Sequence, residues 1–106
     1  DNSLAHYNLG VALMGQERPD DAIIEYNRAI KIDPKYANAY YALGMIYQAK
    51  GDQQDAVSAY EKYVQLDPDG PYIQAAKENL EKLKQALGPA VAPSAERVSE
   101  GDAARN

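Results

Sequence analysis

Two consecutive stretches of 34 residues decide the fold of this chain. Residues 3–36 read SLAHYNLGVALMGQERPDDAIIEYNRAIKIDPKY, and residues 37–70 read ANAYYALGMIYQAKGDQQDAVSAYEKYVQLDPDG. Aligned without gaps, they share nine identical pairs: Ala5/Ala39, Tyr7/Tyr41, Leu9/Leu43, Gly10/Gly44, Asp21/Asp55, Ala22/Ala56, Tyr26/Tyr60, Asp33/Asp67 and Pro34/Pro68. Ordinary residue frequencies give about two matches by chance. The chain therefore contains an internal repeat, and periods of this length are typical of stacked helical units.

Each repeat is predicted to form two helices. The first helices are expected at about 3–16 and 37–50, and the second helices begin near Pro19 and near Gln53. Proline suits the first turn of a helix, and acidic residues stabilise that turn by facing the positive end of the helix dipole. The Asp-Pro steps at 33–34 and 67–68 end the second helices, because proline disfavours helical backbone in the residue before it.

The turns inside the two hairpins are expected to differ. Gly51 follows the first helix of the second repeat, where a left-handed cap is predicted. Glu17 takes the equivalent position in the first repeat. Because a side chain disfavours left-handed backbone, the first repeat is expected to have a looser turn.

The repeated residues resemble the signature of the tetratricopeptide repeat. The matching residues are Leu9, Gly10, Ala22, Tyr26, Ala29 and Pro34, then Leu43, Gly44, Tyr47, Ala56, Tyr60 and Pro68. The resemblance covers residues 3 to about 87 and implies an all-α fold of antiparallel helix hairpins stacked as an α-α superhelix. Small residues such as Gly10 and Gly44 let paired helices approach closely. Three residues depart from the pattern: His6 and Tyr40 stand where the family often has tryptophan, and Tyr63 replaces a small residue.

Residues 71–87 are predicted to form a capping helix. Apolar residues recur at spacings of three and four on one face only: Ile73, Ala76, Leu80, Leu83 and Leu87. The opposite face holds Gln74, Lys77, Glu78 and Glu81, as expected where a repeat array meets solvent. The predicted organisation is a repeat domain over 1–87, with repeats 3–36 and 37–70 and the cap, followed by a flexible tail over 88–106 that contains Pro89 and Pro93.

The N-terminal side has no comparable cap. Two repeats and a capping helix fall below the roughly three repeats that such arrays usually need. The chain also begins at Asp1. We therefore expect either that further repeats precede it in a longer protein or that a second copy covers the first helix.

The amino-acid composition argues against several classes of function. The 106 residues carry a net charge of −5, with 11 Lys and Arg against 16 Asp and Glu, which argues against nucleic-acid binding. Cysteine is absent, so thiol chemistry is excluded and the redox compartment is not indicated; the cytoplasm is only a default. No apolar run approaches the roughly 18 residues of a membrane span.

Catalytic, cofactor and metal sites are not expected. His6 is the single histidine, it lacks a nucleophile partner, and it is interpreted as a packing residue. The segment 67–70 has two aspartates but lacks the alternating ligands of a calcium loop and is interpreted as a turn. No phosphate-binding glycine motif is present. The chain is predicted not to be an enzyme.

A second apolar stripe is the candidate binding site. The core of the first helix is assigned to Leu9, Gly10 and Leu13, yet a separate stripe carries further apolar side chains, with counterparts at Tyr41 and Met45, and Tyr72 opens the matching line on the cap. Helices with one buried face need one stripe. The resembled fold places this second stripe in a concave groove, although it could instead complete the packing between neighbouring first helices. The candidate groove residues are Tyr7, Val11, Met14, Tyr41, Met45 and Tyr72.

The leading hypothesis is a protein-interaction module, an adaptor that binds an apolar or amphipathic peptide or helix in this groove. One subclass of the family grips C-terminal carboxylates with basic and amide side chains. The matching positions here are Tyr7, Val11, Ala42, Tyr72 and Ala76, so a clamp of that kind is not expected. The alternatives are a self-assembling scaffold that joins through the uncapped first repeat, and an accessory domain of a larger enzyme.

Overall fold

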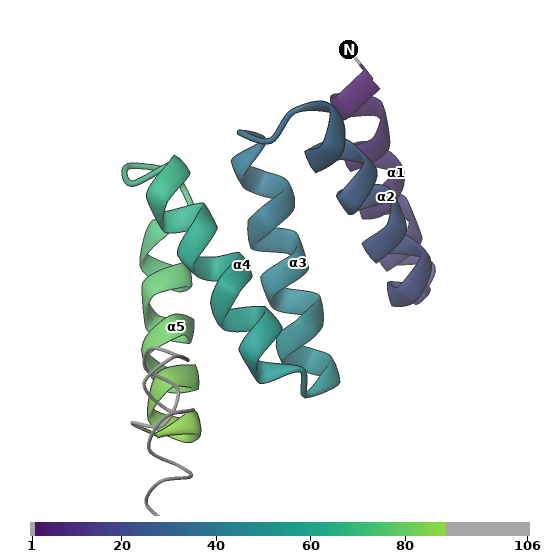
Figure 1. Ribbon diagram of the computed structural model, residues 1–106. Helices are drawn as coiled ribbons and strands as arrows, with labels where there is room; N and C mark the ends of the chain where they lie inside the picture. Colours follow the sequence, from purple (N-terminus) through teal and green to yellow (C-terminus); the bar gives the residue numbers. More distant parts are fainter. Residues whose placement is uncertain (1, 89–106) are drawn as a thin grey trace, which may run out of the picture.

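The computed structural model describes residues 2–88 as helices joined by short turns (Figure 1). The order along the chain is α1 (Asn2–Gly15), α2 (Pro19–Ile32), α3 (Ala37–Lys50), α4 (Gln53–Leu66) and α5 (Ile73–Leu87). No strand occurs among the described residues, and the all-α prediction is confirmed. The tail predicted over 88–106 lies, apart from Gly88, outside the described residues.

The helices pack as two antiparallel hairpins followed by α5. Helices α1 and α2 form the first hairpin, α3 and α4 form the second, and α5 lies beside α4 (Figure 1). The hairpins join where α2 packs against α3. Gly10 and Gly44 make the close approach possible: a Cβ at Gly44 would lie 2.7 Å from Cε1 of the buried Tyr60 ring, and Gly10 faces Tyr26 in the same way.

Two apolar clusters form the core. The first joins the two hairpins and contains Leu13, Ala22, Tyr26, Ala39, Leu43, Ile46 and Ala59. The second joins α4 to α5 and contains Ala56, Val57, Tyr60, Tyr63, Ala76 and Leu83. Ile73, Leu80 and Leu87 pack half-buried against the second cluster. The apolar stripe predicted for the capping helix therefore does face α4, although the helix begins at Ile73 rather than at residue 71.

The core assignment of Leu9 is wrong. Its side chain is 47% exposed, whereas the equivalent Leu43 is 4% exposed. Leu43 is buried because α2 packs on that face of α3, and among the described residues no helix takes the equivalent position on α1. The repeat pattern identified a residue that can be buried, and the neighbouring helix decides whether it is.

The expected looser turn at Glu17 is also wrong. The Arg18 N–H donates to the Leu13 carbonyl and the Glu17 N–H to the Met14 carbonyl, and the same two bonds recur from Asp52 to Tyr47 and from Gly51 to Gln48. Glu17 adopts φ 61°, in the left-handed region that Gly51 occupies at φ 87°. The first turn keeps the same geometry and holds a glutamate in a conformation that favours glycine.

Candidate functional site

A groove of about 950 Å³ opens between α1 and α3. All six candidate residues line it, from three different helices or their ends: Tyr7, Val11, Met14, Tyr41, Met45 and Tyr72. The stripe on α1 and the stripe on α3 face the same space because both helices are the first helix of a hairpin. The structure therefore brings the predicted residues together in one place.

Stacked tyrosines form one end of the groove. The rings of Tyr41 and Tyr72 stack with centroids 4.6 Å apart and planes 5° apart. Tyr72 is held in place by its backbone N–H, which donates to the Tyr63 hydroxyl at 3.0 Å. Tyr7 stacks on Tyr36, with ring centroids 5.2 Å apart. Such stacked ring pairs stabilise their arrangement beyond the burial of area alone, so the tyrosines support one another at this end of the groove.

The hydroxyls of Tyr7 and Tyr41 remain protonated. Burial raises the pKa of Tyr7 and of Tyr41 above the ordinary value of 10.0, and the neighbouring Tyr72 adds to both shifts. Burial is also the largest cause for Tyr26, whose pKa rises to about 12. These groups are neutral at physiological pH and offer hydrogen-bond donors rather than charge.

Exposed aliphatic side chains form the middle of the groove. Val11 is 48% exposed and Met45 is 47% exposed, and Met14 lies beside them in the same lining. These side chains are not enclosed between α1 and α3, so the packing explanation for the second stripe does not account for them. Methionine suits an adaptable contact surface because its side chain is unbranched and polarizable.

The other end of the groove carries charge. Glu17, Pro19 and Lys50 line it. The Lys50 ammonium donates to Asp20 Oδ1 at 2.7 Å, and this hydrogen bond is the largest cause that raises the pKa of Lys50. The pair joins the end of α3 to the start of α2.

Sequence reasoning missed part of the lining. The additional residues are Glu17, Pro19, Tyr26, Ala42, Ile46, Ala49 and Lys50. Continuing the α3 stripe would have found Ala49, because it follows Met45 by four residues, whereas Glu17 lies beyond the end of α1, where helical spacing no longer applies. Tyr26 was identified only as a residue of the repeat signature; it belongs to the first core cluster and also lines the groove.

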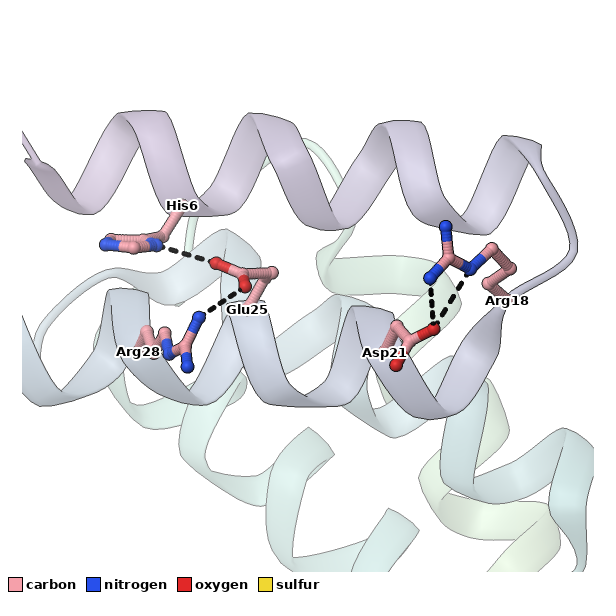
Figure 2. A network of polar contacts seen from close by, with 5 residues as sticks. All are labelled: His6, Arg18, Asp21, Glu25 and Arg28. Carbon is pink, nitrogen blue, oxygen red and sulfur yellow. Dashed lines mark hydrogen bonds and ion pairs between the residues drawn. The ribbon is translucent and has the colours of Figure 1, made fainter.

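A polar network lies apart from the groove, between α1 and α2 (Figure 2). His6 Nδ1 is 2.7 Å from Glu25 Oε1, and Arg28 Nη1 donates to Glu25 Oε2 at 2.7 Å. His6, interpreted as a packing residue, is half-buried and also forms this polar contact. The hydrogen bond from His6 is the largest cause that lowers the pKa of Glu25; burial opposes it, and Arg28 lowers the pKa further.

This network is peculiar to the first repeat and stabilises its hairpin. Tyr40 and Ala59 stand at the positions equivalent to His6 and Glu25. Within residues 2–88, no three His, Asp or Glu side chains gather as a metal-binding group. None of the helices in that range is long and apolar enough to cross a membrane.

Stacked antiparallel hairpins with an open groove define the class of helical-repeat proteins. A family model described as tetratricopeptide repeat matches residues 7–71, and the chain belongs to that family. Repeats of this family generally mediate protein–protein interactions and are typically not enzymes. Comparison with curated proteins gives no match.

Proposed function

We propose that this chain is an interaction module that binds one apolar or amphipathic helix in the groove between α1 and α3. The observation that carries the proposal is the convergence of exposed apolar side chains from α1, α3 and the start of α5 on one groove. Soluble proteins seldom expose large contiguous apolar patches without a binding role.

The dimensions of the groove favour a helical guest. Tyr7 and Met14 are seven residues apart on α1, which corresponds to about 10 Å along the helix axis. A guest helix covers that length in about two turns and presents apolar side chains at i, i+3, i+4 and i+7. A contact of this size, with the entropy cost of ordering the guest, supports micromolar affinity, or about −8 kcal/mol.

Met45→Glu tests this function. The side chain is 47% exposed, so the variant should retain its fold, with a change in unfolding free energy within about 0.5 kcal/mol. A fluorescent helical peptide with leucines at i, i+3, i+4 and i+7 should bind the variant more than tenfold more weakly, a loss of about 1.4 kcal/mol. Fluorescence anisotropy measures the binding, and urea denaturation measures the stability.

Ile24→Glu is the matched control. Ile24 is 48% exposed on α2 and does not line the groove, so this variant should bind the peptide like the wild type. Two results would contradict the proposal: Met45→Glu unfolds the protein by several kcal/mol, as a buried methionine would, or the peptide binds all three proteins equally. A peptide that fails to bind the wild type also counts against it.

A second candidate function, self-association, has an observation of its own. Ala5, Leu9 and Ala12 are exposed on α1, whereas their equivalents Ala39, Leu43 and Ile46 are buried. Helix α1 also contains no Asp, Glu, Lys or Arg, as is usual for a helix covered on several sides. Light scattering after size exclusion tests this candidate: a mass of 11.6 kDa that does not change with concentration eliminates it.

A further inference from the structure

Two charged residues line the groove, Glu17 and Lys50, and the contacts within the fold explain only Lys50. Glu17 follows the last residue of α1 by two positions, and it lines the groove at the α1–α2 turn. Its position therefore places a carboxylate next to the apolar surface proposed to hold a guest helix.

The turn does not require a glutamate. Gly51 makes the same turn in the second repeat, where an added Cβ would meet no atom within 4 Å, so glycine is there for its backbone freedom and not for space. Glu17 adopts φ 61°, a left-handed backbone that is unfavourable for a residue with a side chain. Backbone strain of this kind tends to occur at functional sites, which favours a role for the side chain outside folding.

The Glu17 carboxylate also lacks a cationic partner. The nearby cations are engaged elsewhere: Lys50 binds Asp20 at 2.7 Å, and Arg18 binds Asp21 at 2.8 Å. Within residues 2–88, Glu17 forms no ion pair. The groove therefore ends in one uncompensated negative charge on a protein whose net charge is −5.

We infer that Glu17 selects guest helices that carry a Lys or Arg about one turn past the end of their apolar stripe, along the helix axis. The inference rests on the proposed function of the groove. Tyr7 lies about 12 Å along α1 from Gly15, where the helix ends, and Glu17 follows two residues later in the turn, so a guest whose apolar side chains contact the tyrosines and Met45 would bring its next turn to the carboxylate. Charge complementarity at the rim of an apolar contact sets specificity more than affinity.

Charge reversal tests this selection. Four helical peptides share one apolar face. Two carry Lys and two carry Glu, in each case once at the N-terminal end and once at the C-terminal end, since either guest orientation fits the groove. For one end, the wild type should bind the Lys peptide at least about threefold more tightly than its Glu counterpart, as expected for a partly exposed ion pair. Glu17→Gln should remove this preference and Glu17→Lys should reverse it, while Glu78→Gln, an exposed site outside the groove, should leave it unchanged.

Salt and Met45→Glu separate the possible outcomes. The preference should shrink as the salt concentration rises from about 0.05 M to about 1 M, because exposed charges are screened. If the four peptides bind equally and Glu17→Gln changes nothing, while Met45→Glu still weakens binding, the selection by Glu17 is refuted and the groove function stands. If Met45→Glu has no effect, or no peptide binds, both are refuted. Thermal denaturation of each variant shows that it is folded.

Discussion

Repeats 3–36 and 37–70 place the same hairpin in two different settings. Leu43 is covered by α2, whereas the equivalent Leu9 is exposed on α1. The turn of the second repeat contains Gly51, whereas the first keeps the strained Glu17. The two hairpins thus have the same backbone arrangement, but their side chains meet different surroundings. The second hairpin has neighbouring helices on both sides, whereas the first described hairpin has a neighbour on one side only.

The leucine pair provides the largest expected contrast. Leu43→Ala removes a buried side chain and should lower the unfolding free energy by about 2–5 kcal/mol. Leu9→Ala, at an exposed position, should lower it by less than about 1 kcal/mol. Urea denaturation of both variants measures the difference. Similar losses in a monomeric sample would show that the α1 face is covered in solution and that the two settings do not differ.

Substitutions at the two turn residues, Glu17 and Gly51, should change the unfolding free energy by an intermediate amount and in opposite directions. Glu17→Gly relieves left-handed strain, partly offset by the greater freedom of glycine in the unfolded chain, and should raise the unfolding free energy by about 0.5–1 kcal/mol. Gly51→Glu should lower it by a similar amount. Thermal and urea denaturation measure both changes. A destabilising Glu17→Gly would mean that the glutamate contributes to folding, which removes the main reason to assign it a role in binding.

The polar network should give the smallest effect, visible in the pH dependence. In the folded state the pKa of Glu25 lies below its ordinary value of 4.5, chiefly because of the hydrogen bond from His6. A lowered carboxyl pKa contributes stability above pH 4.5, and that contribution disappears as the pH falls through the folded-state pKa. Wild type should therefore lose slightly more stability than Glu25→Gln between pH 6 and pH 3.

Melting temperatures of both proteins across this range measure the contrast, and the other acidic residues cancel in the difference. Glu78→Gln is the matched control, because it makes the same carboxyl-to-amide change at an exposed site outside the network. It should leave the pH dependence of the wild type unchanged. Parallel pH profiles for wild type and Glu25→Gln would show that the network contributes nothing to the difference between the repeats.

The local features of the fold could be predicted well because they depend on neighbours in the sequence. The Asp-Pro steps, Pro19 and Gly51 set where helices begin and end, and the structure places helix ends within one or two residues of the predicted positions. The stripe of Tyr7, Val11 and Met14 follows from helical spacing alone. That these residues meet Tyr41, Met45 and Tyr72 in one groove required the family resemblance as well.

The features that prediction missed depend on contacts between distant residues. The exposure of Leu9 follows from which helix lies beside it, and the pairing of His6 with Glu25 joins residues 19 positions apart. The left-handed backbone of Glu17 arises because the packing of α1 on α2 requires the same turn in both hairpins. Local preference at Glu17 opposes that backbone, and tertiary packing overrides it.

By itself, the sequence determined the period of 34 residues, the helix type and the apolar stripes, since these follow from the spacing of side chains along a helix. Tertiary structure alone decided three things: which leucine is buried, which tyrosines stack, and which carboxylates pair with a cation. The physical reason is that burial and ion pairing depend on what faces a side chain across a helix interface. Hairpins that share the residues of one repeat face different neighbours.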